Sequence, residues 1–238
     1  MTLLELTARQ ILASRRWLLI LALGSIVPLV AMLARARGFA PEFAAQIFPQ
    51  LFLGVVVPLL ALVVSVSAVA GDIEEGTAVY LLCTPVGRGY IFATRYMTAI
   101  AVTVLVATAA GASSFLILSG SMEDTAGRIL ASTVAVAVGG VLYTALFLAL
   151  ALYSRRGVML GLLYALVWEN ILARNMAGAR TFSIREYMVS IQAHLSPDPS
   201  ATASLTLSAI VPVACVMLAA SIALGISSLR NFQATEKS

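Results

Sequence analysis

Lysine, histidine and cysteine are almost missing from this chain, and each scarcity removes a class of chemistry. The 238 residues hold one lysine, Lys237, and one histidine, His194. A phosphate-binding loop needs a lysine that contacts the transferred phosphates, so the sequence contains no nucleotide-binding loop. The two cysteines, Cys83 and Cys215, are poor disulfide partners, and together with a single histidine they form no metal-ligand cluster.

Charge is equally scarce. Charged residues make up 11% of the chain and hydrophobic residues 61%, whereas about 25% of the residues of a soluble domain are charged. The composition is typical of an integral membrane protein, and the polar–apolar alternation of a membrane β-barrel is absent. The formal charge of +4 does not indicate nucleic-acid binding, because the arginines stand singly or in pairs at the ends of apolar runs.

Six apolar runs predict an all-α fold with six transmembrane helices in one domain, residues 1–238. Each run can cross all or most of the roughly 30 Å of bilayer hydrocarbon as a helix. The first is interpreted as a retained span, because no signal-peptide cleavage site follows it. The fifth is the shortest. The predicted spans are 17–34, 48–70, 96–118, 129–153, 157–173 and 201–229.

Two amphipathic segments lie outside these spans. Residues 1–16 predict a helix in the membrane interface, with a solvated extension of the first span as the alternative. Ser183 and Glu186 form a capping-box pattern, and apolar residues at helical spacing follow them up to Pro197. This second segment predicts an interfacial helix on the opposite side of the membrane. A small-residue stripe in the fourth span and a G-x-x-x-G pair in the fifth predict close helix packing (Ala131, Ala135, Gly139; Gly157, Gly161).

The distribution of basic residues predicts that both termini are cytoplasmic. With that orientation, nine lysines and arginines lie inside and six lie outside, which agrees with the positive-inside rule. The pairs Arg15–Arg16 and Arg155–Arg156 stand directly at span ends on the inner side.

The segment 71–95 between the second and third spans is then cytoplasmic. Asp72 and Glu75 have the spacing of a helix cap, and Pro85 ends the helical pattern. The helix so predicted is about 16 Å long, which is too short to cross a bilayer. Its second half, residues 79–83, is apolar on every side, so it must contact headgroups, its own spans or another protein. A re-entrant or interfacial loop therefore remains open at this point.

Several residues of this segment carry a family resemblance. Glu75-Gly76-Thr77, then Leu81-Leu82, Pro85 and Arg88 resemble the first cytoplasmic loop of type-2 ABC exporter permeases. The amphipathic N-terminal helix, the six spans and a Trp168-Glu169 pair near the end of the fifth span are similar too. The chain has Arg95 where the family often has lysine. The resemblance implies an elbow helix over 1–16 and a coupling helix over 72–88 that docks on an ATPase through these residues: Asp72, Ile73, Glu74, Glu75, Thr77, Tyr80, Leu81, Leu82, Pro85 and Arg88.

The resemblance also implies the partners. A separate ABC ATPase subunit would bind ATP and magnesium, so this chain would need no cofactor, and a second permease copy, identical or sister, would complete the transporter in the cell membrane. The chain itself is then not an enzyme. Paired-glutamate membrane proteases need histidines within the bilayer, and His194 lies on the face opposite Glu74 and Glu75.

Two further functions stay open, namely a non-transporting ABC-like sensor or assembly subunit and a secondary carrier. The second, third, fourth and sixth spans carry no ionisable side chain, whereas ion-coupled carriers usually have carboxylates near the midplane. This absence favours a hydrophobic or amphiphilic cargo. Glu169, with Trp168, is a candidate for substrate contact or gating. Alternatively, Glu169 lies at headgroup level, where it pairs with Arg174 or caps the outer helix.

Overall fold

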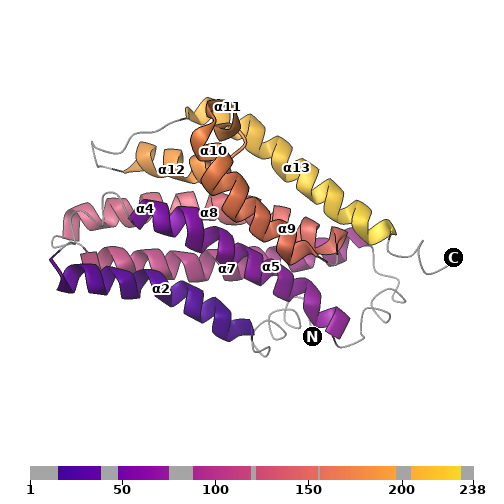
Figure 1. Cartoon of the computed structure of the whole chain (residues 1–238), viewed down its shortest axis with the longest axis horizontal. Coiled ribbons are helices and arrows are strands. Elements are labelled where there is room, and N and C mark those ends of the chain that lie inside the picture. Colours follow the sequence, from indigo (N-terminus) through magenta and orange to yellow (C-terminus); the bar gives the residue numbers. More distant parts are fainter. Residues whose placement is uncertain are drawn as a thin grey trace.

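The computed structural model describes residues 16–38, 48–74, 88–118, 122–154, 156–196 and 205–231, and most of these residues are helical. Figure 1 shows α2, α5, α7 and α8 running along the long axis of the molecule. The second apolar run is one continuous helix in three parts, α4, the π-helical η2 and α5. The helices are α2 (Arg16–Ala36), α4 (Phe48–Leu51), η2 (Phe52–Val56), α5 (Val57–Glu74), α7 (Arg88–Leu118), α8 (Met122–Tyr153), α9 (Gly157–Leu163), η3 (Tyr164–Leu172), α10 (Ala173–Asn175), α11 (Ala177–Arg180), α12 (Ile184–Leu195) and α13 (Leu207–Asn231).

Five of these helices are long and apolar enough to cross a membrane. They match five of the predicted spans, so the expectation of an all-α, multi-pass membrane protein is confirmed at that level. The helix predicted over 157–173 is present as α9, η3 and α10, and its apolar part has 16 residues, Gly157–Leu172. That length gives about 24 Å, less than the roughly 30 Å of hydrocarbon.

Two helix ends beside the segment 71–95 differ from the sequence prediction. α5 continues without a break to Glu74, so Asp72 lies inside a helix and does not cap the start of a new one. α7 begins at Arg88, so the residue Gly89 belongs to its first turn rather than to a loop. Single glycines such as Gly71 and Gly89 lower helix stability by only about 1 kcal/mol, and a long flanking helix tolerates them.

The residues just before the predicted fourth span, 129–153, are also helical. Glu123 and Asp124 lie in the first turn of α8. The predicted elbow helix, apart from Arg16, lies outside the described residues.

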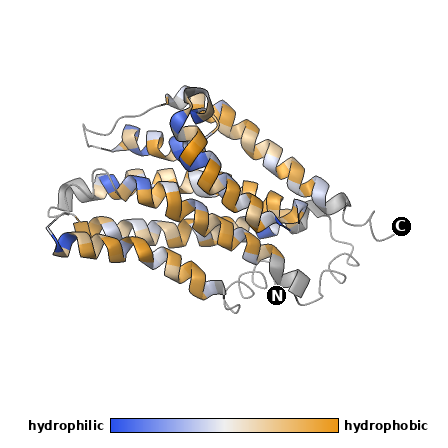
Figure 2. Cartoon of the chain, in the orientation of Figure 1, coloured by the Kyte–Doolittle hydropathy of each residue, from blue (hydrophilic) through white to orange (hydrophobic). Residues whose placement is uncertain are grey.

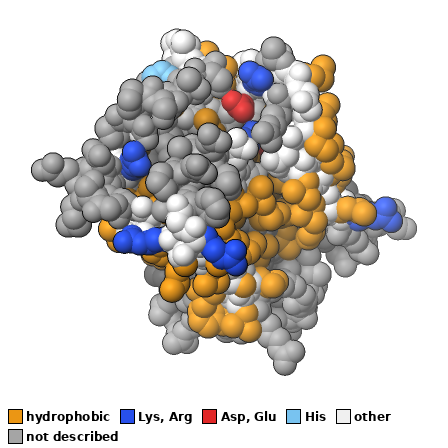
Figure 3. All heavy atoms as spheres, turned by 60° about the vertical axis from the view of Figure 1, so that its left-hand side comes forward, with side chains coloured by type: hydrophobic (Ala, Val, Ile, Leu, Met, Phe, Trp, Pro, Cys, Tyr) orange, Lys and Arg blue, Asp and Glu red, His pale blue; other side chains and the backbone are white. Residues whose placement is uncertain are grey.

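The core of the bundle is the α4–η2–α5 helix. It packs against α8, α7 and α2, and most of its side chains are buried, including Phe52, Leu60 and Val64. By contrast, α2 and α13 turn large apolar side chains outward, and Figure 2 shows the hydrophobic colour extending along them. An exposed apolar surface of this extent suits lipid contact rather than water. Figure 3 shows basic side chains beside this surface near one end of the molecule.

The small residues predicted to allow close packing do so. Ala131 and Ala135 are buried on α8, and a side chain at Gly139 would overlap Met188 of α12, with its Cβ only 2.0 Å from the sulfur. A Cβ at Gly161 would lie 2.3 Å from Leu62 of α5. Gly139 therefore receives α12, and Gly161 allows α9 to pack against α5.

Candidate functional site: a buried carboxylate at the start of α12

The outer amphipathic segment forms the helix α12. One of the two hydrogen bonds of the predicted capping box is present at its start. The Ser183 side chain accepts a hydrogen bond from the Glu186 backbone N–H at 3.2 Å. The return bond of a capping box is replaced, because the Ser183 N–H donates to the Arg180 carbonyl at 3.1 Å. The Glu186 carboxylate instead lies 3.5 Å from the Arg185 guanidinium.

Glu169 of η3 supplies the rest of the cap. Its side chain is completely buried. One carboxylate oxygen, Oε1, accepts a hydrogen bond from the Ile184 backbone N–H at 3.0 Å, and Oε2 accepts one from the Ser183 hydroxyl. Of the interpretations left open by the sequence, capping of the outer helix is the one observed. The depth of Glu169 in the bilayer stays a prediction, and the Arg174 side chain is not among those described.

Two tyrosines complete the surroundings of this carboxylate. The hydroxyl groups of Tyr143 on α8 and Tyr164 on η3 both interact with Glu169. Tyr143 is fully buried, and neither hydroxyl makes a hydrogen bond of regular geometry with any described group. The indole N–H of Trp168 is likewise buried and unpaired among the described residues. The cluster thus gathers several donors around one carboxylate.

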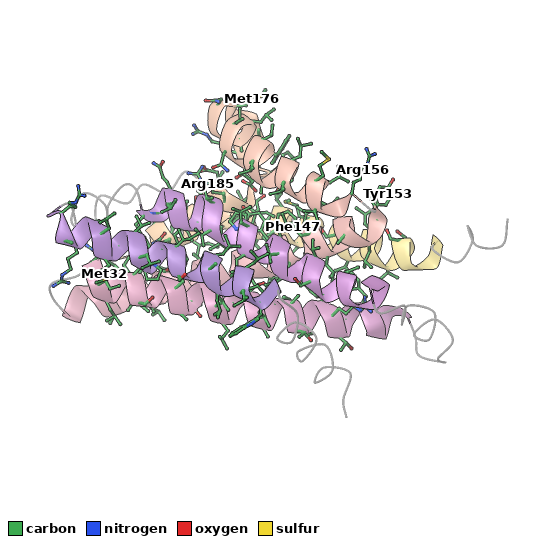
Figure 4. All side chains as sticks on the ribbon, turned by 60° about the horizontal axis from the view of Figure 1, so that its bottom comes forward. Met32, Phe147, Tyr153, Arg156, Met176 and Arg185 are labelled. Atoms are coloured by element: carbon green, nitrogen blue, oxygen red, sulfur yellow. The ribbon has the colours of Figure 1, made fainter. Side chains whose placement is uncertain are left out.

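Arg185 lies on the other side of the α12 start. It is 6% exposed and packs over Gly54 of η2, where a Cβ would stand only 2.8 Å from its Nε atom. That Nε has no hydrogen-bond partner among the described groups. Figure 4 shows Arg185 within the bundle beside the α4–α5 helix, whereas Met176 lies at the edge. The absence of a side chain at Gly54 is what leaves room for the guanidinium.

Both helices that hold this region are π-helical at that point. Asn170 of η3 donates a hydrogen bond to the Ala165 carbonyl at 2.8 Å and another to the Gly54 carbonyl of η2 at 3.4 Å. π-helical turns in otherwise α-helical segments are frequent at functional sites. The wider π-turn changes which side chains face the interior. In η3 it includes Glu169, whose side chain points at α12.

Tyr187 is a buried side chain that holds the same turn in place. Its hydroxyl donates to the Thr181 carbonyl and also lies 3.9 Å from the Met217 sulfur of α13. Burial, with a smaller contribution from the negative charge of Glu169, raises the pKa of Tyr187 to about 12. The phenol therefore remains a neutral donor at physiological pH.

The groups gathered here are hydrogen-bond donors around a carboxylate. Among the described residues, no group of three His, Cys, Asp or Glu side chains could hold a metal ion. Cys215 is exposed on α13. The cluster offers a helix N-terminus, hydroxyl groups and a guanidinium around one carboxylate.

No family model matches the chain, and no curated protein matches it either. The comparisons therefore leave the family resemblance of segment 71–95 as a hypothesis.

The described part of the chain covers the predicted docking segment only at its two ends. The backbone of Asp72, Ile73 and Glu74 forms the end of α5, and that of Arg88 begins α7. The remaining predicted docking residues lie outside the described residues (Glu75, Thr77, Tyr80, Leu81, Leu82 and Pro85).

Of the two predicted substrate or gate residues, Glu169 belongs to the buried cluster, and Trp168 is its neighbour in η3. Sequence reasoning missed Tyr143, Tyr164, Gly54 and Arg185. The available signal was Tyr143, a polar aromatic residue in the middle of an otherwise apolar span.

Proposed function

We propose that this chain is the membrane-spanning permease subunit of an ATP-driven exporter of the ABC type, located in the cell membrane with both termini in the cytoplasm. The observation that carries the proposal is the pattern Glu75-Gly76-Thr77, Leu81-Leu82, Pro85 between two spans. The cargo class that suits its mostly charge-free spans is hydrophobic or amphiphilic.

The helices on either side of this segment support a role in transmitting motion. Residues 75–87 connect α5 directly to α7. α5 is the central helix of the bundle and contacts α8, α7 and α2. A displacement applied to residues 75–87 therefore reaches the core through a continuous helix. A loop attached only to the lipid-facing helices α2 and α13 would lack this connection.

The energy source in this proposal is a partner. The sequence has no phosphate-binding loop, so a separate ATPase subunit binds ATP and magnesium. The proposed working unit has two permease copies, identical or sister chains, and two ATPase subunits. Binding of ATP closes the ATPase pair, and the segment 72–88 passes that movement to the spans.

Site-specific photo-crosslinking tests the docking. A photoreactive residue at Ala78, in the native membrane, should form a covalent link to an ATP-binding protein that carries a phosphate-binding loop. The matched control is the same photoreactive residue at Met176, which is exposed and lies beyond the C-terminal end of η3. It should not form this link. Links from Ala78 to lipid or to this chain alone would contradict the proposal and favour an interfacial loop.

A secondary carrier is the second candidate, and one observation favours it. Glu169 is an ionisable group inside the bundle, and such groups often relay protons in carriers. However, Oε1 and Oε2 are both engaged in capping α12, which accounts for the carboxylate without proton transfer. A proton-driven flux through the purified chain in vesicles without any ATPase, lost in Glu169→Gln, would establish the carrier instead.

A further inference from the structure

The helix formed by α9 and η3 is shorter than the bilayer that must surround it. Its apolar part has 16 residues, Gly157–Leu172, and a length of about 24 Å, against roughly 30 Å of hydrocarbon. Figure 1 shows α9 running obliquely to α7 and α8, so its extent along their direction is smaller still. The apolar part of α2 has 20 residues, which gives about 30 Å. Two lipid-facing helices of one bundle therefore differ in apolar length by about 6 Å.

A short polar side chain marks the C-terminal end of this apolar part. Asn175 is exposed, and its side-chain amide donates a hydrogen bond to the Ile171 carbonyl at 2.8 Å. A long arginine or lysine side chain can reach from hydrocarbon to the headgroups, but an amide held against its own helix cannot. The headgroup region must therefore come to the level of Asn175 for this amide to be hydrated.

The outward side of the same helix carries large apolar side chains. Four of them are between 45% and 69% exposed in the described part of the chain (Met159, Leu163, Leu166 and Ile171). The small residues of the helix are instead buried against the bundle (Gly157, Gly161 and Ala165). Interfaces between membrane helices are enriched in small residues, because these let the backbones approach closely. The outward side therefore has the composition of a surface for acyl chains rather than for another helix.

We propose that this outward side of α9 and η3, the short face, binds phospholipids whose acyl chains are shorter than those of the surrounding bilayer. A helix shorter than the hydrocarbon thickness is accommodated by a thinner lipid layer, by long flanking side chains or by association with another helix. The position of Asn175 disfavours the second solution, and the large outward side chains disfavour the third. The face of α2 matches the bilayer and has no such preference.

The two tryptophans of the chain report on the two faces separately. Trp17 begins the apolar part of α2 and is 38% exposed. Trp168 lies in η3, between the exposed residues Leu166 and Ile171. Bromine atoms on an acyl chain quench the fluorescence of a nearby tryptophan. Loss of quenching when an unbrominated lipid is added therefore measures how well that lipid competes for the face beside the tryptophan.

Lipid competition in vesicles tests the proposal. The full-length chain is reconstituted in brominated phosphatidylcholine with 18-carbon chains, and a small fraction of unbrominated lipid with 14-carbon or 18-carbon chains is added. In Trp17→Phe, where only Trp168 reports, the 14-carbon lipid should compete at least about twofold better than the 18-carbon lipid. In Trp168→Phe, where only Trp17 reports, the two lipids should compete equally.

A lengthened helix tests whether apolar length is the cause. Arg174→Leu together with Asn175→Leu extends the apolar run beyond Leu172, so in the Trp17→Phe chain the preference for the 14-carbon lipid should disappear. Arg37→Leu is the matched control, since it removes an exposed charge beyond α2 and leaves the short face intact. This control should retain the preference.

Three results would overturn the short face. The first is equal competition by the two lipids beside Trp168. The second is a preference that persists in the lengthened variant. The third is an absence of quenching of Trp168 by brominated lipid, which would show that protein, such as a second copy of the chain, covers this side. Because the measurement needs no ATPase, its outcome is independent of the proposed ABC assignment.

Discussion

Adding a single methyl group at Gly139 should dislodge α12 from α8. The Cβ of an alanine there would lie 2.0 Å from the Met188 sulfur and 2.6 Å from its Cγ, whereas ordinary contact begins at 3.4 Å. The sulfur must therefore retreat by about 1.4 Å. Met188 is completely buried, so this movement displaces either its rotamer or the whole of α12.

The expected magnitude follows from two opposing effects. Overpacking of a filled interior costs about 1–3 kcal/mol, and replacing glycine by alanine in a helix returns about 1 kcal/mol. Gly139→Ala should therefore lower the free energy of unfolding by up to about 2 kcal/mol. Gly140→Ala is the matched control, since it gains the same helix propensity and its closest contact is 3.0 Å from the Val104 side chain. That variant should be near neutral.

The assay is thermal unfolding of the purified chain in detergent together with hydrogen exchange of the α12 amides. Met188→Ala should cost about 2–5 kcal/mol alone, because it empties a buried site. In the double variant Gly139→Ala/Met188→Ala the two effects should be less than additive, with a coupling of about 0.5–3 kcal/mol. Strictly additive effects of Gly139→Ala and Met188→Ala would refute the packing of α12 against α8 at Gly139. Equal stability of the Gly139→Ala and Gly140→Ala variants would refute it too.

Other substitutions test the neighbouring contacts. Ser183→Ala removes the cap of α12 and one donor to Glu169, so unfolding measurements should show a loss of about 1–3 kcal/mol; no loss would contradict the cap. Gly161→Ala should destabilise α9 by about 1–3 kcal/mol, and Leu62→Ala should relieve this, because the clash involves that side chain at 2.3 Å. Burial raises the pKa of Tyr187 from 10.0 to about 12, so its stabilising contribution is complete below pH 10.0 and declines as pH rises towards 12; Tyr187→Phe should lack this decline.

Hydropathy was sufficient to predict most of the fold. The five long spans follow from uninterrupted apolar runs, and α12 follows from the Ser183–Glu186 pattern and its helical periodicity. Helix ends were less predictable. Asp72 has the chemistry of a cap, but α5 continues through it, because a helix already formed extends at little cost compared with starting a new one.

The candidate site could be predicted only in part. Glu169 stands out in the sequence as a carboxylate in an apolar run, and capping of the outer helix was among its expected roles. The direction in which it points depends on the π-helical η3, and the burial of Arg185 depends on the missing side chain at Gly54, 131 positions earlier in the chain. Neither π-turns nor long-range pairings leave a periodic signal, so tertiary packing decides them.

The central claim, that an ATPase drives this chain through residues 72–88, is tested most directly by ATP hydrolysis in the complex captured from its native membrane. Glu75→Lys should abolish the stimulation of the ATPase by the permease while thermal unfolding of the spans stays unchanged. Arg37→Glu, an equal charge reversal at an exposed residue beyond α2, should leave the stimulation intact. A Glu75→Lys chain that still captures a fully stimulated ATPase would contradict the claim.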